Sequence, residues 1–213
     1  AAEQPAKLRE MIDLWWTQAG EMGVLPLDDR TIELFGGTPR PGTPHERTTY
    51  QYLAPISHIP SDVCPPLGGR NWTLTIDLTV PVPMPGGPRI EGVLYARGTH
   101  SVGHAFYVKD GELRFHYNAL GDSYTVRGPI ELNAGEHTVV AAFTREGKGG
   151  VLTLSVDGTE IATGPIPKLV RMLGSTGLDI GRDAMSPKTS DYAAPFPFTG
   201  AILPLGIWCG SVS

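Results

Sequence analysis

The stretch NWTLTIDLTV, from Asn71 to Val80, alternates apolar and polar side chains without a break. A repeat of two residues is the period of a β-strand, because successive side chains of a strand point to opposite faces. The stretch therefore predicts a strand with one buried face and one solvent-facing side, as in an antiparallel sheet that covers a core. The apolar face would carry Trp72, Leu74, Ile76, Leu78 and Val80.

Similar runs fill most of the chain after Thr48. Asp110-Gly111 and Asp157-Gly158 each separate two β-rich runs, and Asp-Gly is a strong signal for a two-residue hairpin. About ten to twelve strands are expected between Thr48 and Cys209, with no helical period between them, so antiparallel pairing is favoured. That many strands predict two sheets packed face to face. The turn pattern resembles an all-β jelly-roll sandwich of the concanavalin-like or laminin-G-like kind.

The front of the chain differs from the rest. In KLREMIDLWWTQAGEMGVLPLDDR, from Lys7 to Arg30, apolar residues recur at helical spacing on one stripe, which predicts an amphipathic helix that ends near Gly23. We expect Trp15 to pack inward on the sandwich. Leu14 and Trp16 are then expected to contact a surface outside this chain; the alternative is that both tryptophans pack on the chain's own sandwich.

These patterns divide the chain into three parts. Residues 1–35 would hold the helix and its connection, residues 36–47 a linker rich in proline and glycine, and residues 48–213 the sandwich. A chain of 213 residues is long enough for such a domain to bury a sizeable core without disulfides.

Composition excludes several classes of function. The 17 basic and 22 acidic residues give a net charge of −5, and no run of Lys or Arg would follow a phosphate backbone, so we expect no nucleic-acid partner. No apolar stretch is long enough for a membrane span, and no signal peptide is recognisable. We expect a cytoplasmic protein, with a periplasmic or secreted location left open. Cys64 and Cys209 are expected as structural thiols, with a disulfide between them as the alternative.

The richest cluster of oxygen ligands lies in LDIGRDAMSPKTSDY. Asp179, Asp183, Ser186 and Asp191 could supply the six to eight oxygens that calcium prefers, and the rims of sandwiches tolerate such loops. We therefore treat Asp179, Asp183 and Asp191 as candidate calcium ligands. The alternative is a loop tied down by Arg182 and by Asp and Ser side chains that bond to their own backbone.

Enzymatic signals are weak. His104 and His116 could face each other across a hairpin and bind a metal together with His100, although outward positions on a solvated sheet explain them as well. No pair of carboxylates has the spacing that a glycosidase needs. The segment from Cys64 to Arg70 departs from the sulfatase signature, because Gly68 stands where that signature has arginine.

Longer strings carry a resemblance to a known family. The chain is similar over nearly its full length to the C-terminal region of bacterial arylsulfatases, above all in the front helix with GVLPLDDR and in GLDIGRDAMSPKTSDYAAPFPFTGAI. The resemblance implies a non-catalytic sandwich that packs on an upstream sulfatase domain and borders its substrate cleft. That upstream domain would contain the formylglycine nucleophile and the divalent cation. No catalytic residue is carried over to this chain.

A second reading is a lectin-like carbohydrate-binding module. Exposed aromatic side chains such as Tyr95, Tyr107 or Tyr117 would stack on sugar faces, with calcium held near Asp179 and Asp183. A sulfated or other carbohydrate ligand is expected under either reading.

Overall fold

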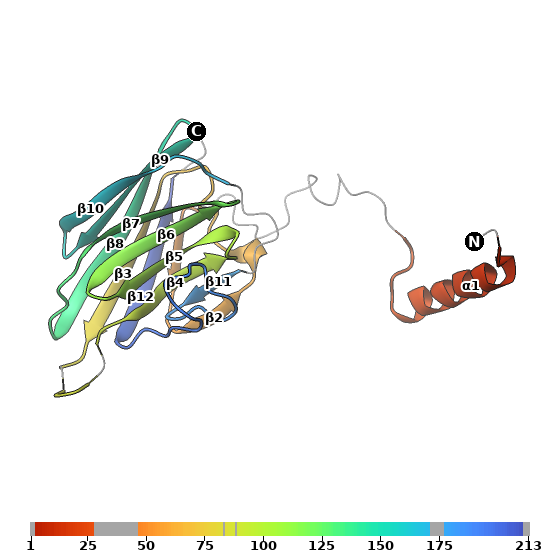
Figure 1. Ribbon diagram of the computed structural model, residues 1–213, viewed down its shortest axis with the longest axis horizontal. Helices are drawn as coiled ribbons and strands as arrows, with labels where there is room; N and C mark the ends of the chain where they lie inside the picture. The colour runs from red at the N-terminus through yellow and green to blue at the C-terminus, as the bar shows by residue number, and fades with distance from the viewer. Residues whose placement is uncertain (1–2, 28–46, 83, 88, 171–176, 211–213) are drawn as a thin grey trace. The chain divides into compact units, whose positions relative to one another are not determined.

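The computed structural model describes residues 3–27, 47–82, 84–87, 89–170 and 177–210. They belong to two units, Ala1–Gly42 and Thr43–Ser213, each described by itself. The first unit contains helix α1 (Pro5–Glu21) and the second contains all the strands (Figure 1). Residues 36–46 of the predicted linker lie outside the described residues.

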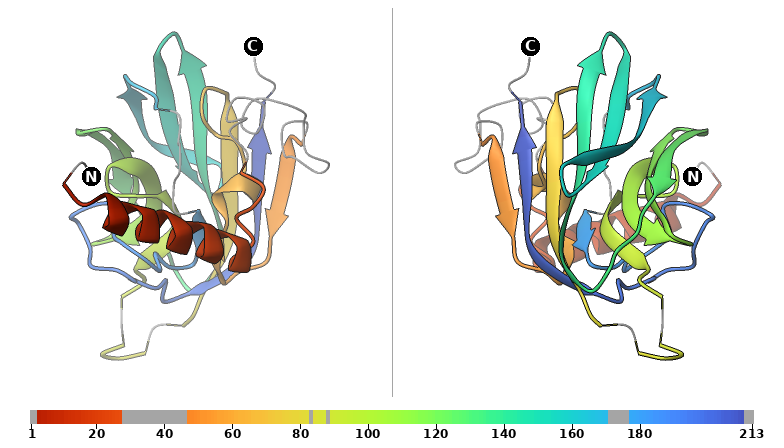
Figure 2. Two further views of the ribbon diagram at one scale, coloured as in Figure 1. Left: turned by 90° about the vertical axis from the view of Figure 1, so that its right-hand side faces the viewer. Right: turned by 90° about the vertical axis from the view of Figure 1, so that its left-hand side faces the viewer.

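The second unit is a sandwich of two six-stranded sheets, as predicted. Sheet A has the strand order β1-β12-β3-β8-β9-β10 and sheet B the order β2-β11-β4-β5-β6-β7. All neighbouring strands are antiparallel, and the right panel of Figure 2 shows β12 between β1 and β3. The elements are β1 (Thr49–Tyr52), β2 (Ile56–Ile59), the 3-10 turn η1 (Ser61–Val63), β3 (Trp72–Val80), β4 (Gly92–Gly98), β5 (Val102–Lys109), β6 (Glu112–Ala119), β7 (Asp122–Pro129), β8 (Gly135–Glu146), β9 (Gly149–Val156), β10 (Thr159–Ile166), β11 (Leu178–Ile180) and β12 (Ala201–Cys209).

Strand β3 confirms the alternation from which the fold was predicted. Its nine residues alternate between buried and half-buried, with the apolar series facing the core. Trp72 connects the two sheets, because its ring stacks on Phe143 of sheet A at 5.7 Å and lies 5.5 Å from Phe115 of sheet B. The core is therefore an apolar layer between the two sheets.

The two Asp-Gly hairpins also form as predicted. Asp110 and Gly111 have φ values of 53° and 74°, and Asp157 and Gly158 have 49° and 78°. Positive φ at both central residues matches the twist of a two-residue hairpin, and Asp and Gly tolerate it better than other residues.

Sheet B is buried on both faces over β4, β5 and β6, which the sequence did not predict. The connection between β11 and β12, residues 181–200, covers its outer face, where Tyr192 and Phe196 pack on Val93, Ala96 and Tyr107. The N–H of Val93 donates to Phe196 O at 2.9 Å. Strand β3 of sheet A, by contrast, keeps the alternation of a sheet with one buried and one solvent-facing side.

Helix α1 ends as its sequence predicts. Gly23, just beyond the helix, has a φ of 69°, and the amide of Val24 donates to Ala19 O at 2.8 Å. Trp15 and Trp16 contact each other edge to face at 4.8 Å and are 45% and 49% exposed. The packing of Trp15 on the sandwich, and the contact of Leu14 and Trp16 with another domain, stay predictions. Among the described residues, no helix is long and apolar enough to cross a membrane.

The two cysteines are buried thiols in the core of the sandwich. The thiol of Cys64 donates to Pro60 O at 3.2 Å. Burial raises the pKa of Cys209 to about 11, so its thiol stays protonated at neutral pH.

Candidate functional site

Cationic side chains gather at one end of the sandwich. At this end β3 begins, β8 ends, β9 begins and β10 ends, so antiparallel pairing brings segments from across the sequence together. Arg145 is the last residue but one of β8, Lys148 lies in the β8–β9 hairpin, and Lys168 follows β10. An ion pair of 2.8 Å between Lys168 and Asp122, the first residue of β7, shows that sheet B contributes to the same end.

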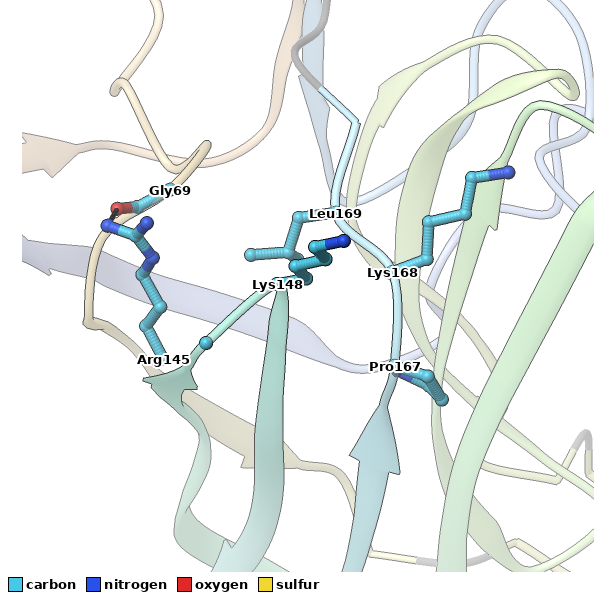
Figure 3. Close-up of a pocket in the computed structure, with 7 residues that line it drawn as sticks. Gly69, Arg145, Lys148, Pro167, Lys168 and Leu169 are labelled. Atoms are coloured by element: carbon cyan, nitrogen blue, oxygen red, sulfur yellow. Dashed lines mark hydrogen bonds between the residues drawn. The ribbon is translucent and has the colours of Figure 1, made fainter.

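These side chains surround a pocket with a volume of about 490 Å³, shown in Figure 3. We call it the basic pocket; its lining is Gly69, Arg145, Gly147, Lys148, Pro167, Lys168 and Leu169. Arg145 is fixed at both ends, since its backbone N–H donates to Asn71 Oδ1 at 2.8 Å and its Nη1 donates to Gly69 O at 3.0 Å. The pocket thus has the positioned guanidinium of Arg145 and the ammonium group of Lys148, whereas the Lys168 side chain extends away from these two (Figure 3) and pairs with Asp122.

The charges of the basic pocket are only partly compensated. None of its seven lining residues is acidic, and among the ion pairs of the described residues only that of Lys168 with Asp122 involves a lining residue. The hydrogen bond from Lys168 to Asp122 raises the pKa of the lysine, which therefore stays protonated. A protein with a net charge of −5 thus has a local concentration of positive charge at this end, which favours an anionic ligand.

An exposed tryptophan lies near the same end, on the outer face of sheet A. Trp208 of β12 is 48% exposed, whereas its neighbours Ile207 and Cys209 are buried. It lies directly opposite Thr49 on one side and Thr73 on the other. The ring reaches over Gly210, because Cη2 lies 3.3 Å from the place where a Cβ of Gly210 would stand.

A short chain of contacts links this ring to the pocket. The amide of Gly210 donates to Asn71 O at 2.8 Å, and the Asn71 side chain in turn accepts from the backbone of Arg145. Thr73 pairs with Ala142, so Trp208 is two strands from β8, or about 10 Å at the usual strand spacing. The indole therefore lies two strand positions from β8, the strand that carries Arg145.

Known structures share this architecture. The CBM40 module of the Ruminococcus gnavus IT-sialidase, bound to α2,6-sialyllactose, is 16% identical over 77% of this chain and 94% of its own, with a TM-score of 0.56. The same module bound to α2,3-sialyllactose is 18% identical over 68% of this chain and 79% of its own, with a TM-score of 0.51. Domains LG4-5 of the mouse laminin α1 chain are 14% identical over 78% of this chain and 46% of their own, with a TM-score of 0.51.

The fold is a concanavalin-like jelly roll. At these identities the likenesses show the fold of the jelly roll and nothing finer. No family model matches the chain, and no curated protein matches it. The resemblance to arylsulfatases thus gains no support from the comparisons.

The three candidate calcium ligands each have other partners in the jelly roll. Asp179 accepts from the amides of His58 and Ala184, at 2.6 and 3.1 Å. Asp191 accepts from Tyr107 Oη at 2.6 Å and from Arg114 Nη1 at 2.9 Å, which lowers the pKa of the carboxyl group.

Asp183 has the most buried of the three carboxylates. It accepts from Lys188 Nζ at 2.6 Å and from Tyr192 Oη at 2.8 Å. In the part of the chain that the structure describes, no three His, Cys, Asp or Glu side chains converge to hold a metal. Calcium binding stays a prediction, and the contacts favour the alternative in which this loop is tied down by its own side chains.

The hypothesis that His104 and His116 face each other across the hairpin is wrong. In the strand register His104 lies opposite Tyr117, whereas His116 lies opposite Ala105 on one side and Thr125 on the other. The two rings therefore point to opposite sides of sheet B. His104 is 2% exposed and lies in the core, where its ring stacks on Tyr95 at 5.4 Å. Burial, with Arg97 and Lys188 near, lowers its pKa to about 3, which keeps the ring neutral.

The tyrosines proposed for sugar stacking are buried. Tyr95 and Tyr107 have no exposed surface and Tyr117 is 8% exposed, because Tyr95 and Tyr117 belong to the core and Tyr107 lies under the 181–200 connection. Trp208 is the residue that sequence reasoning missed. The period-two pattern of Leu205, Ile207 and Cys209 was the available signal, since it assigns Trp208 to the opposite face.

Proposed function

We propose that this chain is a carbohydrate-binding module that holds an acidic glycan at the basic pocket. The observation that carries the proposal is the pocket itself, in which Arg145, Lys148 and Lys168 surround about 490 Å³ without an acidic neighbour in the lining. A guanidinium and ammonium groups suit the carboxylate or sulfate group of an acidic sugar, because charge-assisted hydrogen bonds are about twice as strong as neutral ones.

Trp208 supplies the second kind of contact that sugars need. The C–H faces of a sugar ring are apolar, and an exposed indole offers a flat surface to stack on. The flanking hydroxyl groups of Thr49 and Thr73 lie beside the ring and can bond to sugar hydroxyls. An oligosaccharide would thus place one sugar ring on the indole and its acidic group in the basic pocket.

The structural comparisons support this reading over an enzymatic one. Two of the similar structures are titled as a carbohydrate-binding module with sialyllactose bound, and sialyllactose carries a carboxylate. Among the described residues, no cluster of metal ligands suggests a catalytic centre in this chain. A binding role needs only the surface features described above.

Removing one pocket cation should weaken the binding of acidic glycans. We expect Lys148→Gln to raise the Kd for sialyllactose or a sulfated oligosaccharide about tenfold, because one charge-assisted hydrogen bond contributes about 1.5 kcal/mol. Isothermal titration calorimetry at low salt measures the change. Neutral lactose should bind much more weakly than either acidic glycan.

Lys109→Gln is the matched control for this variant. Lys109 also lies beside a hairpin, at the end of β5 in sheet B, and forms an ion pair with Asp110. It does not line the basic pocket. Its variant should bind as the native protein does. Equal binding of acidic and neutral sugars, or equal loss in the two variants, would contradict the proposal.

The stacking contact predicts a different signature. Trp208→Ala should weaken the binding of both acidic and neutral oligosaccharides several-fold, since aromatic stacking contributes about 0.5–1.5 kcal/mol beyond buried area. Quenching of tryptophan fluorescence by the ligand should fall in the same variant. Trp16→Ala, which removes an exposed indole of α1, is the control and should leave affinity unchanged. An undiminished affinity in Trp208→Ala would remove the ring from the site.

The arylsulfatase reading stays a second candidate. The observation that favours it is helix α1, in which only Ala19 is buried while Leu14 and Trp16 are 56% and 49% exposed. Such surplus apolar surface suits a contact with an upstream catalytic domain. The coding sequence before Ala1 would decide it, because a sulfatase signature there is required.

A further inference from the structure

We infer that Arg70 and Arg97 form a binding site for a compact oxyanion at the same end of the sandwich. The site is separate from the basic pocket, because neither arginine lines that pocket. The ligand would be a sulfate or carboxylate group, either as a free ion or as a substituent of a larger molecule. The inference goes beyond the proposed glycan binding, since a small anion alone would occupy the site.

Both arginine residues are almost fully buried, and the described residues supply no counter-charge to either. Arg97 is 7% exposed and Arg70 is 8% exposed. Within the described ranges, no carboxylate forms an ion pair with either arginine. A buried charge normally has a partner, because taking it out of water costs several kcal/mol.

Arg97 also has an unused donor. Its Nη1 donates to Pro65 O, but Nε is buried and has no acceptor. Buried donors that lack an acceptor are rare in folded proteins and require an explanation. A bound anion would supply that acceptor, and the fork of an arginine fits two oxygens of one oxyanion.

The two guanidinium groups act on the same surroundings. Arg70 and Arg97 both oppose the rise in pKa that burial causes at Tyr50 and at Cys209. Arg97 also contacts the segment that leads to Arg70, because its Nη1 donates to Pro65 O. Arg47 adds a third positive charge, with its guanidinium carbon 5.6 Å from the centre of the Tyr50 ring.

The neighbouring groups that the structure describes do not neutralise this charge. Asp179 pairs with Ala96 and so faces the outer side of sheet B, where both its oxygens accept backbone amides. His104 is opposite Arg97 in register and stays neutral. The Tyr52 hydroxyl, whose pKa burial raises to about 12, is a donor and not a counter-ion.

The backbone leaves room next to the site. Gly68 and Gly69 precede Arg70, and no other atom lies within 4 Å of the place where a Cβ would stand on either glycine. Gly69 also lines the basic pocket. Gly68 is exposed and Gly69 is half-buried, so the turn before Arg70 lies at the surface.

The test is a titration of the full chain with sodium sulfate, with sodium chloride at equal ionic strength as the reference. The side-chain Nε–Hε signal of Arg97 in a ¹H–¹⁵N spectrum should shift saturably with sulfate only. In Arg70→Gln the apparent Kd for sulfate should rise about tenfold, since one charge-assisted contact is lost. Arg127→Gln, which changes an exposed arginine of β7, should match the native protein.

The Arg97→Met variant gives an independent readout. Its thermal midpoint should not depend on sulfate beyond the general salt effect that Arg127→Gln also shows. If this variant does not fold, the sulfate titrations of the native protein and of Arg70→Gln still test the inference. An Arg97 signal that does not respond to sulfate, or an unchanged Kd in Arg70→Gln, would overturn the inference.

A parallel titration with sialyllactose distinguishes this inference from the proposed function. Sulfate binding that depends on Arg70, without any glycan binding, supports the oxyanion site and contradicts the glycan proposal. Glycan binding that depends on Lys148, with no response of Arg97 to sulfate, supports the glycan proposal and contradicts the oxyanion site.

Discussion

Replacing Lys188 by methionine will lower the free energy of unfolding by about 3–5 kcal/mol, the usual cost of removing one partner of a buried ion pair. Lys188 Nζ lies 2.6 Å from Asp183 Oδ1, and the side chains are 2% and 0% exposed. The ammonium also donates to Ser186 O at 2.7 Å. Without it, the Asp183 carboxylate would be left buried with only Tyr192 and one amide as donors.

Urea denaturation at neutral pH measures this loss. Lys168→Met is the matched control, because its ion pair with Asp122 has a similar N–O distance of 2.8 Å but is about half exposed, and exposed pairs contribute little to stability. The double variant Asp183→Asn with Lys188→Met should recover part of the loss, since no charge remains buried. If Lys188→Met and Lys168→Met cost the same, the buried pair does not stabilise the 181–200 connection.

Lowering the pH from 7 to 5 will destabilise the domain by about 2 kcal/mol through His104 alone. Its pKa is about 3 in the folded state, against about 6.5 when unfolded, because burial disfavours the charged ring. The folded state therefore favours the neutral form. This contribution is fully present above the unfolded pKa and is lost as pH falls from about 6.5 towards 3.

The measurement compares stability between pH 5 and 7.5 in the native protein and in His104→Phe. The variant keeps an aromatic ring for stacking on Tyr95 and Phe115 but cannot take up a proton. His116, with a lowered pKa, and His137, with a pKa raised by Asp157, titrate in both proteins and cancel in the difference. Identical slopes in the native protein and His104→Phe would contradict the assignment.

The fold was predictable because its signals are local. Alternation in β3 and the Asp-Gly turns depend on residues next to each other, and both agree with the structure. Burial of sheet B on both faces could not be predicted in this way. It depends on the 181–200 connection, which lies far from β4 and β5 in sequence and packs Tyr192 and Phe196 on them.

The candidate site was not predictable for the same reason. Gly69, Arg145, Lys148 and Lys168 are scattered along the chain, and only strand pairing brings them to one end. The sequence analysis treated the oxygen-rich loop as a candidate calcium site, and the pattern of aspartates did not indicate that Lys188 contacts Asp183 and Arg114 contacts Asp191. Charge clusters formed by distant segments require the topology first.

The place of β12 in sheet A has a consequence for synthesis on the ribosome. This strand separates β1 from β3, so those two strands have no hydrogen-bonded neighbour on the facing sides until β12 has emerged. A nascent chain that ends before Ala201 would expose two open strand edges, which are templates for aggregation. Sheet A can therefore close only late in translation, and chaperone binding to the nascent chain should last until that closure.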